Sequence, residues 1–264
     1  MSEIKKLKYA MVTGASKGIG RSMAVALAKR KINLLLVARS ADELHGLQND
    51  IKKKYGVEVD ILSIDLSLPQ SPKEVTDWVN AKNYAVYILI NNAGYGLWGK
   101  FAALDLTAQL EMCQLNMNTV TSLCHLLLPI LSKEKEAYIL NVSSTAAYQA
   151  VPTLAIYSAT KAFILSFTRA LRFELKNTGV SVSCLSPGPV DTGFASRAGL
   201  DAFSKMAEKF NMQPDEVAEI AIKGMFNKKS EIIPGFTNII SVYANRILPK
   251  GFIEKMAAGI YKTK

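Results

Sequence analysis

Short apolar runs alternate with longer segments in which apolar residues recur every three or four positions, from one end of this sequence to the other. A short run bounded by turn residues is typical of a buried strand, and the longer spacing is typical of a helix with one buried face. The runs predict strands at 9–13, 33–38, 57–64, 86–91, 137–143, 180–186 and 231–233. The periodic segments predict helices at 18–30, 41–55, 71–80, 107–131, 157–177 and 214–227. This alternation predicts an α/β fold with a parallel sheet of about seven strands and helices on both faces.

No internal repeat or low-complexity linker interrupts the alternation, so we expect one domain over residues 1–264. Doubly wound sheets often exceed ~200 residues as a single unit, which makes one domain compatible with this length. After Thr192 comes a stretch rich in Ala, Phe and Lys. This stretch, near 193–213, predicts a variable loop that contacts the substrate.

The end of the chain, near 238–264, predicts an amphipathic extension of two short helices. One helical face holds Ile239, Ile240, Tyr243 and Ile247. After a break at residues 249–251, a second face holds Phe252, Ile253, Met256 and Ile260. Three roles fit these faces: packing or a subunit contact, a cover over an apolar substrate, and contact with an anionic membrane. The cover is the hypothesis we carry forward, and peripheral membrane contact is not favoured.

Composition indicates a folded protein without a membrane span. Hydrophobic residues make up 49% of the chain and charged residues 20%, which is enough to build a large core. The longest apolar stretch, 126–131, contains Pro129 and is far shorter than the ~20 residues that a spanning helix needs. No apolar run follows the basic N-terminus, so we predict a cytoplasmic protein. Cys113, Cys124 and Cys184 lack C-x-x-C spacing and are expected to be small buried side chains in a reducing compartment.

The formal net charge of +10 is concentrated at the two ends of the chain. Residues 1–31 carry 8 Lys or Arg against 1 Glu, and residues 223–264 carry 8 against 2 acidic residues. Basic ends can attract anionic partners, but most surface lysines only solvate a fold. We expect no nucleic-acid partner. His45 and His125 belong to no metal-ligand spacing, and no Gly-x-Ser-x-Gly elbow suggests a hydrolase, so no metal is expected.

A glycine-rich turn follows the first predicted strand and opens the first predicted helix. Residues 13–20 read Thr-Gly-Ala-Ser-Lys-Gly-Ile-Gly. Glycine permits a tight turn and close approach of a ligand, and the helix N-terminus attracts a pyrophosphate. In this context the turn predicts a dinucleotide site whose contacts include Gly14, Ser16, Lys17, Gly18, Ile19 and Gly20.

The end of the second predicted strand indicates which dinucleotide is bound. An NAD site places a carboxylate there for the ribose 2′-hydroxyl, but this chain has Arg39 followed by Ser40. An arginine suits a 2′-phosphate, and Lys17 can add a second positive charge. Asp42 lies nearby but begins the next helix, where a carboxylate suits the helix dipole. The sequence therefore predicts NADP(H) as the cofactor.

Tyr157 and Lys161 are four residues apart on a predicted helix, so both side chains lie on one face. The pair opens the helix after the fifth strand, near the carboxyl ends where α/β sheets place their sites. An ammonium beside a phenol favours the phenolate and lowers its pKa from the usual ~10. The pair therefore predicts proton transfer by Tyr157.

With these motifs in this order, nearly the whole chain resembles the short-chain dehydrogenase/reductase family, in its single-domain NADP(H)-dependent branch. The family motifs are Thr13-Gly14-x-x-x-Gly18-x-Gly20, Asp65-Leu66, Asn91-Asn92-Ala93-Gly94, Asn116, Ser144, Tyr157-x-x-x-Lys161, and Pro187-Gly188 followed by Thr192. The resemblance implies a Rossmann-type doubly wound sheet.

The resemblance also implies roles for individual residues. Ser144 would hold the substrate carbonyl oxygen, with Ser143 as an adjacent competitor for that role. Lys161 would also bind the nicotinamide ribose, and Asn116 would support a water-linked proton relay. The other cofactor contacts implied are Asp65, Leu66, Asn91, Ala93, Gly94, Pro187, Gly188, Val190 and Thr192. Asn91 to Gly94 could alternatively be only a strand-ending turn, and Asn116 a bent-helix residue bonded to backbone.

Together these observations predict hydride transfer between NADP(H) and the carbonyl or alcohol group of a small molecule. Tyr95, Leu97, Trp98 and Phe194 are expected in loops above the nicotinamide, which favours an apolar ketone, a steroid-like compound or a 3-oxoacyl compound. The alternatives are a catalytically silent NADP(H) sensor and a binding protein with a basic surface.

The resemblance further suggests that the helices predicted at 107–131 and 157–177 pair across a two-fold axis in a homodimer or homotetramer. Leu115, Leu123 and Leu127 on the first helix could equally pack against the chain's own sheet.

Overall fold

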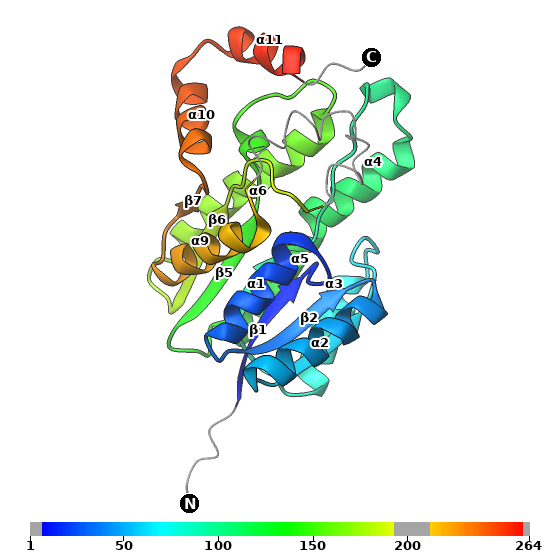
Figure 1. The fold of residues 1–264 in the computed structure, drawn as a ribbon, viewed down its shortest axis with the longest axis vertical. Helices are drawn as coiled ribbons and strands as arrows, with labels where there is room; N and C mark the ends of the chain where they lie inside the picture. The colour runs from blue at the N-terminus through cyan, green and yellow to red at the C-terminus, as the bar shows by residue number, and fades with distance from the viewer. Residues whose placement is uncertain (1–6, 193–211, 261–264) are drawn as a thin grey trace, which may run out of the picture.

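A computed structural model describes residues 7–192 and 212–260, and it contains one seven-stranded parallel sheet (Figure 1). The strands lie in the order β3-β2-β1-β4-β5-β6-β7. Their bounds are β1 Lys8–Thr13, β2 Asn33–Ala38, β3 Val59–Ser63, β4 Ala85–Asn91, β5 Ala137–Val142, β6 Val180–Leu185 and β7 Glu231–Ile232. The predicted α/β fold with a Rossmann-type sheet is therefore confirmed.

Helices cover both faces of the sheet because successive strand residues point to opposite sides. On one face Val12 packs in a core with α1 (Gly18–Lys29), α2 (Ala41–Tyr55) and α9 (Pro214–Phe226). On the other face Met11 packs in a second core with α3 (Ser71–Ala81), α5 (Val120–Leu131) and α6 (Ala155–Glu174). Strands buried on both faces explain why they are almost continuously apolar in the sequence.

The chain order reverses at the centre of the sheet, between β1 and β4. The chain moves from β1 outward through β2 to β3, then returns to β4 and continues outward on the other side. The connections after β1 and β4 therefore diverge at the carboxyl edge and leave a crevice between them. Ligands of open α/β sheets bind at such a switch point.

Two elements differ from the prediction by two or more residues at one or both ends, apart from the interrupted helix described below. The strand expected at 57–64 covers only Val59–Ser63, because β3 is an edge strand that pairs with β2 alone. The helix expected at 157–177 begins two residues earlier, after Leu154, and ends at Glu174. The residues that follow form a turn in which Thr178 N–H bonds to Leu175 O.

The helix expected at 107–131 is interrupted by a wide turn. It consists of α4 (Leu106–Cys113), one π-helical segment (Gln114–Thr119) and α5. A π turn inserts one extra residue into an α-helix and is frequent at functional sites. Asn116 lies within this turn, and its side chain bonds to the backbone of Tyr95 rather than facing solvent.

The predicted C-terminal extension forms α10 (Phe236–Ile247) and α11 (Lys250–Ile260), which extend beyond the carboxyl end of the sheet in Figure 1. Only part of the expected apolar faces is buried. Ile240, Tyr243 and Ile247 are exposed, whereas Val242 and Asn245 face the protein. The loop expected at 193–213 falls outside the described residues except for Met212 and Gln213.

The cysteines match the expectation for small buried side chains in two of three cases. Cys124 and Cys184 are buried, and burial raises the pKa of both thiols to about 12, so both are neutral. Cys113 is only partly buried. Among the described helices, none is long and apolar enough to cross a membrane.

Candidate active site

The glycine-rich turn joins β1 to α1 at the crevice and can be built only with glycine. Gly14 and Gly18 have φ angles of +64° and +54°, a conformation that other residues rarely adopt. A Cβ on Gly20 would lie 2.3 Å from Gly14 O. The turn therefore exposes backbone to a ligand at the start of α1, where free N–H groups can bind phosphate.

Two polar side chains clamp this turn to the end of β4. The Thr13 hydroxyl donates to Ile90 O at 3.2 Å and accepts from the N–H groups of Asn92 and Ala93 at 2.9 and 3.1 Å. The Asn92 amide donates to Thr13 O and Gly14 O at 3.0 and 3.2 Å. The two loops at the switch point are thus locked together, and Asn92 is a positioning residue.

A cavity of about 870 Å³ opens beside the turn. Its lining includes Ser16, Lys17, Gly18, Glu43 and Thr192. The volume lies within the ~300–1,000 Å³ common for small-molecule sites. Five predicted or neighbouring residues are therefore brought together around one open space.

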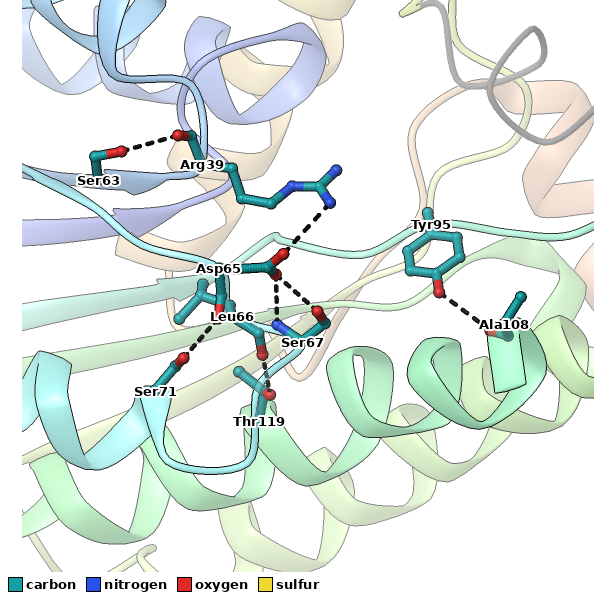
Figure 2. A network of polar contacts seen from close by, with 9 residues as sticks. All are labelled: Arg39, Ser63, Asp65, Leu66, Ser67, Ser71, Tyr95, Ala108 and Thr119. Atoms are coloured by element: carbon teal, nitrogen blue, oxygen red, sulfur yellow. Dashed lines mark hydrogen bonds and ion pairs between the residues drawn. The ribbon is translucent and has the colours of Figure 1, made fainter. Parts of the chain in front are cut away.

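The predicted adenosine end carries paired charges (Figure 2). The Arg39 guanidinium lies 3.6 Å from Asp65, and both side chains are partly exposed. Asp65 also accepts bonds from the Ser67 N–H and hydroxyl at 2.9 and 2.7 Å. Burial alone would raise the pKa of the Asp65 carboxyl, but these bonds and the Arg39 charge lower it. Leu66 beside it is buried, and its carbonyl accepts from Thr119 at 2.7 Å.

Glu43 is a second acidic residue at this end, and sequence reasoning missed it. Its Oε1 lies 2.6 Å from the Lys17 ammonium, whose hydrogen bond lowers the pKa of the carboxyl. Its Oε2 is shielded from solvent and has no hydrogen-bond partner among the described residues. Ser40 and Glu43 have the S-x-x-E spacing of a helix cap, but the Ser40 side chain makes no cap bond here.

Tyr157 and Lys161 lie at the other end of the crevice, on the first turns of α6. Both are buried, and the Lys161 ammonium lies 5.8 Å from the centre of the Tyr157 ring. Lys161 Nζ donates to Val142 O at 3.0 Å. Burial lowers the pKa of Lys161 from 10.5 to about 8, because the charged form loses its hydration. The structure thus brings the predicted pair together.

The two candidate serines at the end of β5 have different surroundings. The Ser143 hydroxyl is buried and donates to Lys161 O at 2.7 Å, so it fastens β5 to α6. Ser144 is only partly buried, and its hydroxyl accepts from Ala146 N–H at 3.1 Å at the start of the short 3₁₀ helix Thr145–Tyr148. The Ser144 hydroxyl therefore retains its proton for another acceptor, whereas Ser143 uses its own.

Asn116 lies near Lys161, and hydrogen bonds to the Tyr95 backbone hold its side chain in place. Its amide donates to Tyr95 O at 2.9 Å and to the Thr160 hydroxyl at 3.1 Å, and its oxygen accepts from Tyr95 N–H at 3.2 Å. A Cβ on Gly94 would lie 2.9 Å from Asn116 Oδ1 and 3.4 Å from Lys161 Nζ. A side chain at position 94 would therefore collide with Asn116 and press on Lys161.

Asn91 occupies a different place from its neighbours in the same motif. Its side chain is buried and donates to Asn141 Oδ1 at 2.9 Å, which links β4 to β5 inside the sheet. Its own Oδ1 has no hydrogen-bond partner among the described residues. Any contact of Asn91 with a cofactor would therefore come from its backbone.

The predicted loop after β6 closes the crevice from the opposite side. The Pro187 carbonyl accepts from Thr145 N–H at 2.9 Å, and Val190 forms an isolated parallel bridge with Met212. A Cβ on Gly18 would lie 2.8 Å from the Thr192 side chain. A Cβ on Gly188 would collide with Asn238 of α10. The loop thus connects the glycine-rich turn, the Ser144 segment and the C-terminal helices.

An apolar cluster surrounds Tyr157, separate from the two cores of the sheet. Its buried members are Met112, Val151, Leu154 and Tyr157, and the residues packed against them include Tyr95, Leu97 and Trp98. The Trp98 indole Nε1 is buried without a hydrogen-bond partner among the described residues. Sequence reasoning placed Tyr95, Leu97 and Trp98 in this region, but the unpaired indole donor could not be read from the sequence. Phe194 lies outside the described residues.

Comparison with known proteins gives a consistent result. The family model described as short chain dehydrogenase matches residues 8–202. Very-long-chain 3-oxoacyl-CoA reductase of Mus musculus is 34% identical over 193 residues, which are 71% of this chain and 61% of that protein. Hydroxysteroid dehydrogenase-like protein 1 of Gallus gallus is 32% identical over 191 residues, which are 72% and 57% of the two chains. The chain therefore spans only about 60% of the length of these curated relatives.

A solved structure is similar over almost its whole length. The short-chain dehydrogenase from Sphingobium yanoikuyae in complex with NADPH superposes with a TM-score of 0.82 at 28% identity, covering 98% of both chains.

Proposed function

This chain belongs to the short-chain dehydrogenase/reductase family, and from that premise we propose that it transfers hydride between NADP(H) and an apolar ketone or its alcohol. Family membership makes it an oxidoreductase of C=O and CH–OH groups with a nicotinamide cofactor. The observation that carries the proposal is the buried pair of Tyr157 and Lys161, whose helix is joined through Ser143 to the segment that carries the partly exposed Ser144 hydroxyl.

The residues at the crevice fit a dinucleotide. The turn at Gly14, Gly18 and Gly20 has no room for side chains and presents backbone where a pyrophosphate would be held. Gly94 leaves space in front of Asn116 and Lys161 for a ribose. Arg39 and Lys17 supply the two positive charges that favour the 2′-phosphate of NADP(H).

The bound cofactor supplies or accepts the hydride, and the chain controls the proton. As negative charge develops on the substrate oxygen, the Ser144 hydroxyl donates a hydrogen bond and Tyr157 transfers its proton to that oxygen. Because the pKa of Lys161 is about 8, this side chain is mostly an ammonium at neutral pH. Its charge stabilises the phenolate that Tyr157 becomes. Oxidation of an alcohol uses the same groups in reverse.

The surroundings of Tyr157 favour an apolar substrate with a second hydrogen-bond acceptor. Tyr95, Leu97 and Trp98 pack around the catalytic phenol and exclude water from the reacting carbonyl. The buried Trp98 N–H lacks an acceptor among the described residues, and a site with an unpaired donor discriminates against ligands that cannot satisfy it. Steroid-like ketones and 3-oxoacyl compounds carry both features.

The decisive experiment measures NADPH oxidation by absorbance with a panel of steroid ketones, 3-oxoacyl thioesters, aromatic ketones and sugars. We expect turnover with apolar carbonyl compounds and none in the Tyr157→Phe variant. Preference for sugars would overturn the substrate class. NADPH binding without turnover of any member of the panel would favour the catalytically silent sensor instead.

We also propose that the enzyme is a homodimer or homotetramer with α6 in the interface. Phe163 and Phe173 on α6 are 41% and 69% exposed, which is unusual for phenylalanine on a free surface. Leu123 and Leu127 are buried in the chain's own core, so they cannot provide this contact. Light scattering at micromolar concentration should give a multiple of the 28.9 kDa chain mass, and a monomer would refute the proposal.

A further inference from the structure

The helix α10 turns its more apolar face away from the protein. Phe236, Ile240, Tyr243 and Ile247 recur at intervals of four and three residues, which places them on one helical face. That face is exposed: the four side chains are 76%, 53%, 55% and 82% accessible. The opposite face, which packs on the protein, carries Asn238, Val242 and Asn245, and Asn245 is buried. A helix that only covers the core has the reverse arrangement.

The exposed apolar surface continues into α11. Leu248, Phe252 and Met256 are 40%, 53% and 53% accessible, whereas Ile253 and Ala257 face the protein. We call the seven exposed residues the outer apolar face: Phe236, Ile240, Tyr243, Ile247, Leu248, Phe252 and Met256. They are half of the fourteen large apolar side chains that are exposed in the described part of the chain. Such a concentration marks an interaction surface.

We propose that the outer apolar face docks on an anionic lipid surface. An interfacial helix lies in the plane of the membrane with apolar side chains in the acyl boundary and basic side chains at the headgroups. The order of residues on these helices fits that requirement. Lys255 is one residue from Met256 and three from Phe252, at the border of the face, and it is exposed. Lys250 is exposed at the start of α11.

The charge of this segment selects a lipid surface over a second copy of the chain. Residues 246–264 contain Arg246, Lys250, Lys255, Lys262 and Lys264 against the single acidic Glu254. Pairing two copies through the outer apolar face would bring the exposed Lys250 and Lys255 of the two copies together, whereas an anionic surface attracts them. This interaction is distinct from the α6 contact proposed above.

Docking would also place the active site beside the lipid. α10 begins next to the loop after β6, where Asn238 contacts Gly188, and it lies against the 3₁₀ helix that follows Ser144. The surface goes beyond the proposed reaction and does not depend on it. An apolar substrate dissolved in the lipid would, however, enter from this side.

The test is flotation of the full chain with vesicles of phosphatidylcholine alone and of phosphatidylcholine with phosphatidylserine. We expect binding to the anionic vesicles, weakened by salt, and an affinity loss of about tenfold or more in Ile240→Glu/Ile247→Glu. The matched control is Thr237→Glu/Ser241→Glu, which adds the same charge to the same helix on exposed positions outside the apolar face. The control should lose far less binding.

The outcomes separate the alternatives. Equal losses in the two double variants would mean that only charge matters and would overturn docking through the apolar face. No binding of the parent chain to anionic vesicles would overturn the proposal outright. If the parent chain is an oligomer and the Ile240→Glu/Ile247→Glu variant forms smaller species, a second copy covers the face, and the lipid proposal is overturned. Thermal unfolding of each variant verifies that it is folded. Flotation measures binding directly, so none of these results depends on catalytic activity.

Discussion

The two ends of the crevice are built on opposite physical principles. At the catalytic end Tyr157 and Lys161 are buried on one helix, and the side chains of Lys161 and the neighbouring Ser143 each donate a hydrogen bond to a backbone carbonyl. At the adenosine end Arg39 and Lys17 are 63% and 58% exposed and are held by carboxylates on other elements.

The difference shows where the fold tolerates change. Buried groups bonded to backbone have one geometry, and removing one leaves an unsatisfied partner. Exposed ion pairs contribute little to stability and can be rearranged without disturbing the core. We therefore expect substitutions at the catalytic end to alter rate or stability strongly, and substitutions at the adenosine end to alter cofactor choice alone.

The largest expected effect is on turnover. Tyr157→Phe removes the proton donor and should lower kcat by at least about 10², because a positioned acid typically supplies 10²–10⁴. NADPH affinity, measured by fluorescence titration, should stay nearly unchanged. Tyr138→Phe is the matched control, since Tyr138 lies in the first half of β5 (Ala137–Val142), away from the carboxyl end of the strand, where Ser144 follows. A Tyr157→Phe enzyme that keeps more than about a tenth of the parent rate would show that another acid acts.

The second-largest effect is expected on the free energy of unfolding of the cofactor-free protein. The folded-state pKa of Lys161 is about 8, below its usual 10.5, so unfolding takes up a proton between about pH 8 and 10.5. The free energy of unfolding should therefore fall as pH decreases from 10.5 to 8 and should level off below. The pKa difference corresponds to ~3 kcal/mol at neutral pH. Lys161→Met should recover part of it, seen as a higher melting temperature at pH 7, while activity is lost.

The pH dependence supplies the control for this stability effect. The difference in melting temperature between Lys161→Met and the parent should shrink as the pH rises past 10.5, above which the parent lysine is mostly neutral in both states. A variant that is less stable than the parent at pH 7 would mean that the bond from Lys161 to Val142 O outweighs the burial of the charge.

A smaller effect is expected on cofactor preference. Arg39→Asp should reduce the ratio of NADPH to NADH affinity by tenfold or more, because a charge-assisted bond is worth roughly 1.5–3 kcal/mol and the new carboxylate repels phosphate. Arg39→Met separates loss of attraction from added repulsion. Dissociation constants for both cofactors, measured at two salt concentrations, decide the matter. An unchanged ratio of NADPH to NADH affinity would show that Arg39 does not bind the 2′-phosphate.

The smallest effect is expected at Glu43. Its carboxylate holds the Lys17 ammonium and competes with a 2′-phosphate for it. Glu43→Gln should therefore tighten NADPH binding a few-fold and leave NADH binding unchanged or weaker, since Oε2 can accept from a ribose hydroxyl. Asp42→Asn makes the same charge change on the neighbouring exposed residue and should do less. Equal changes of NADPH affinity in the two variants would mean that Glu43 acts only through its charge and not through its contact with Lys17.

The sequence predicts regular elements well and side-chain networks poorly. The alternation of apolar runs was sufficient for all seven strands, because strands buried on both faces consist mostly of apolar residues. The motif spacing likewise brought Tyr157 and Lys161 to one place. By contrast, the Glu43 to Lys17 pair joins α2 to the glycine-rich turn, and its S-x-x-E spacing indicates only a helix cap.

Sequence periodicity was also insufficient to predict which way the C-terminal helices face. Their apolar periodicity was correctly read as helical, but periodicity cannot say which of two apolar faces points inward. Ile239 and Val242 are directed to the protein side while Ile240 and Tyr243 are exposed, because the contacts that orient α10 come from distant residues such as Gly188. Only tertiary structure fixes that rotation.

The wide turn at Gln114–Thr119 is equivalent to a one-residue insertion preserved within a helix. Each residue of an α-helix advances the side chain direction by about 100°, so the extra residue rotates α5 relative to α4 by that amount. A regular α-helix over the same residues would therefore swing either the Gln109 and Met112 side or the Leu123 and Leu127 side out of its core. The wide turn thereby divides the helix into two halves with separate registers, one packed around Tyr157 and one packed on the sheet, and Asn116 lies at the junction between them.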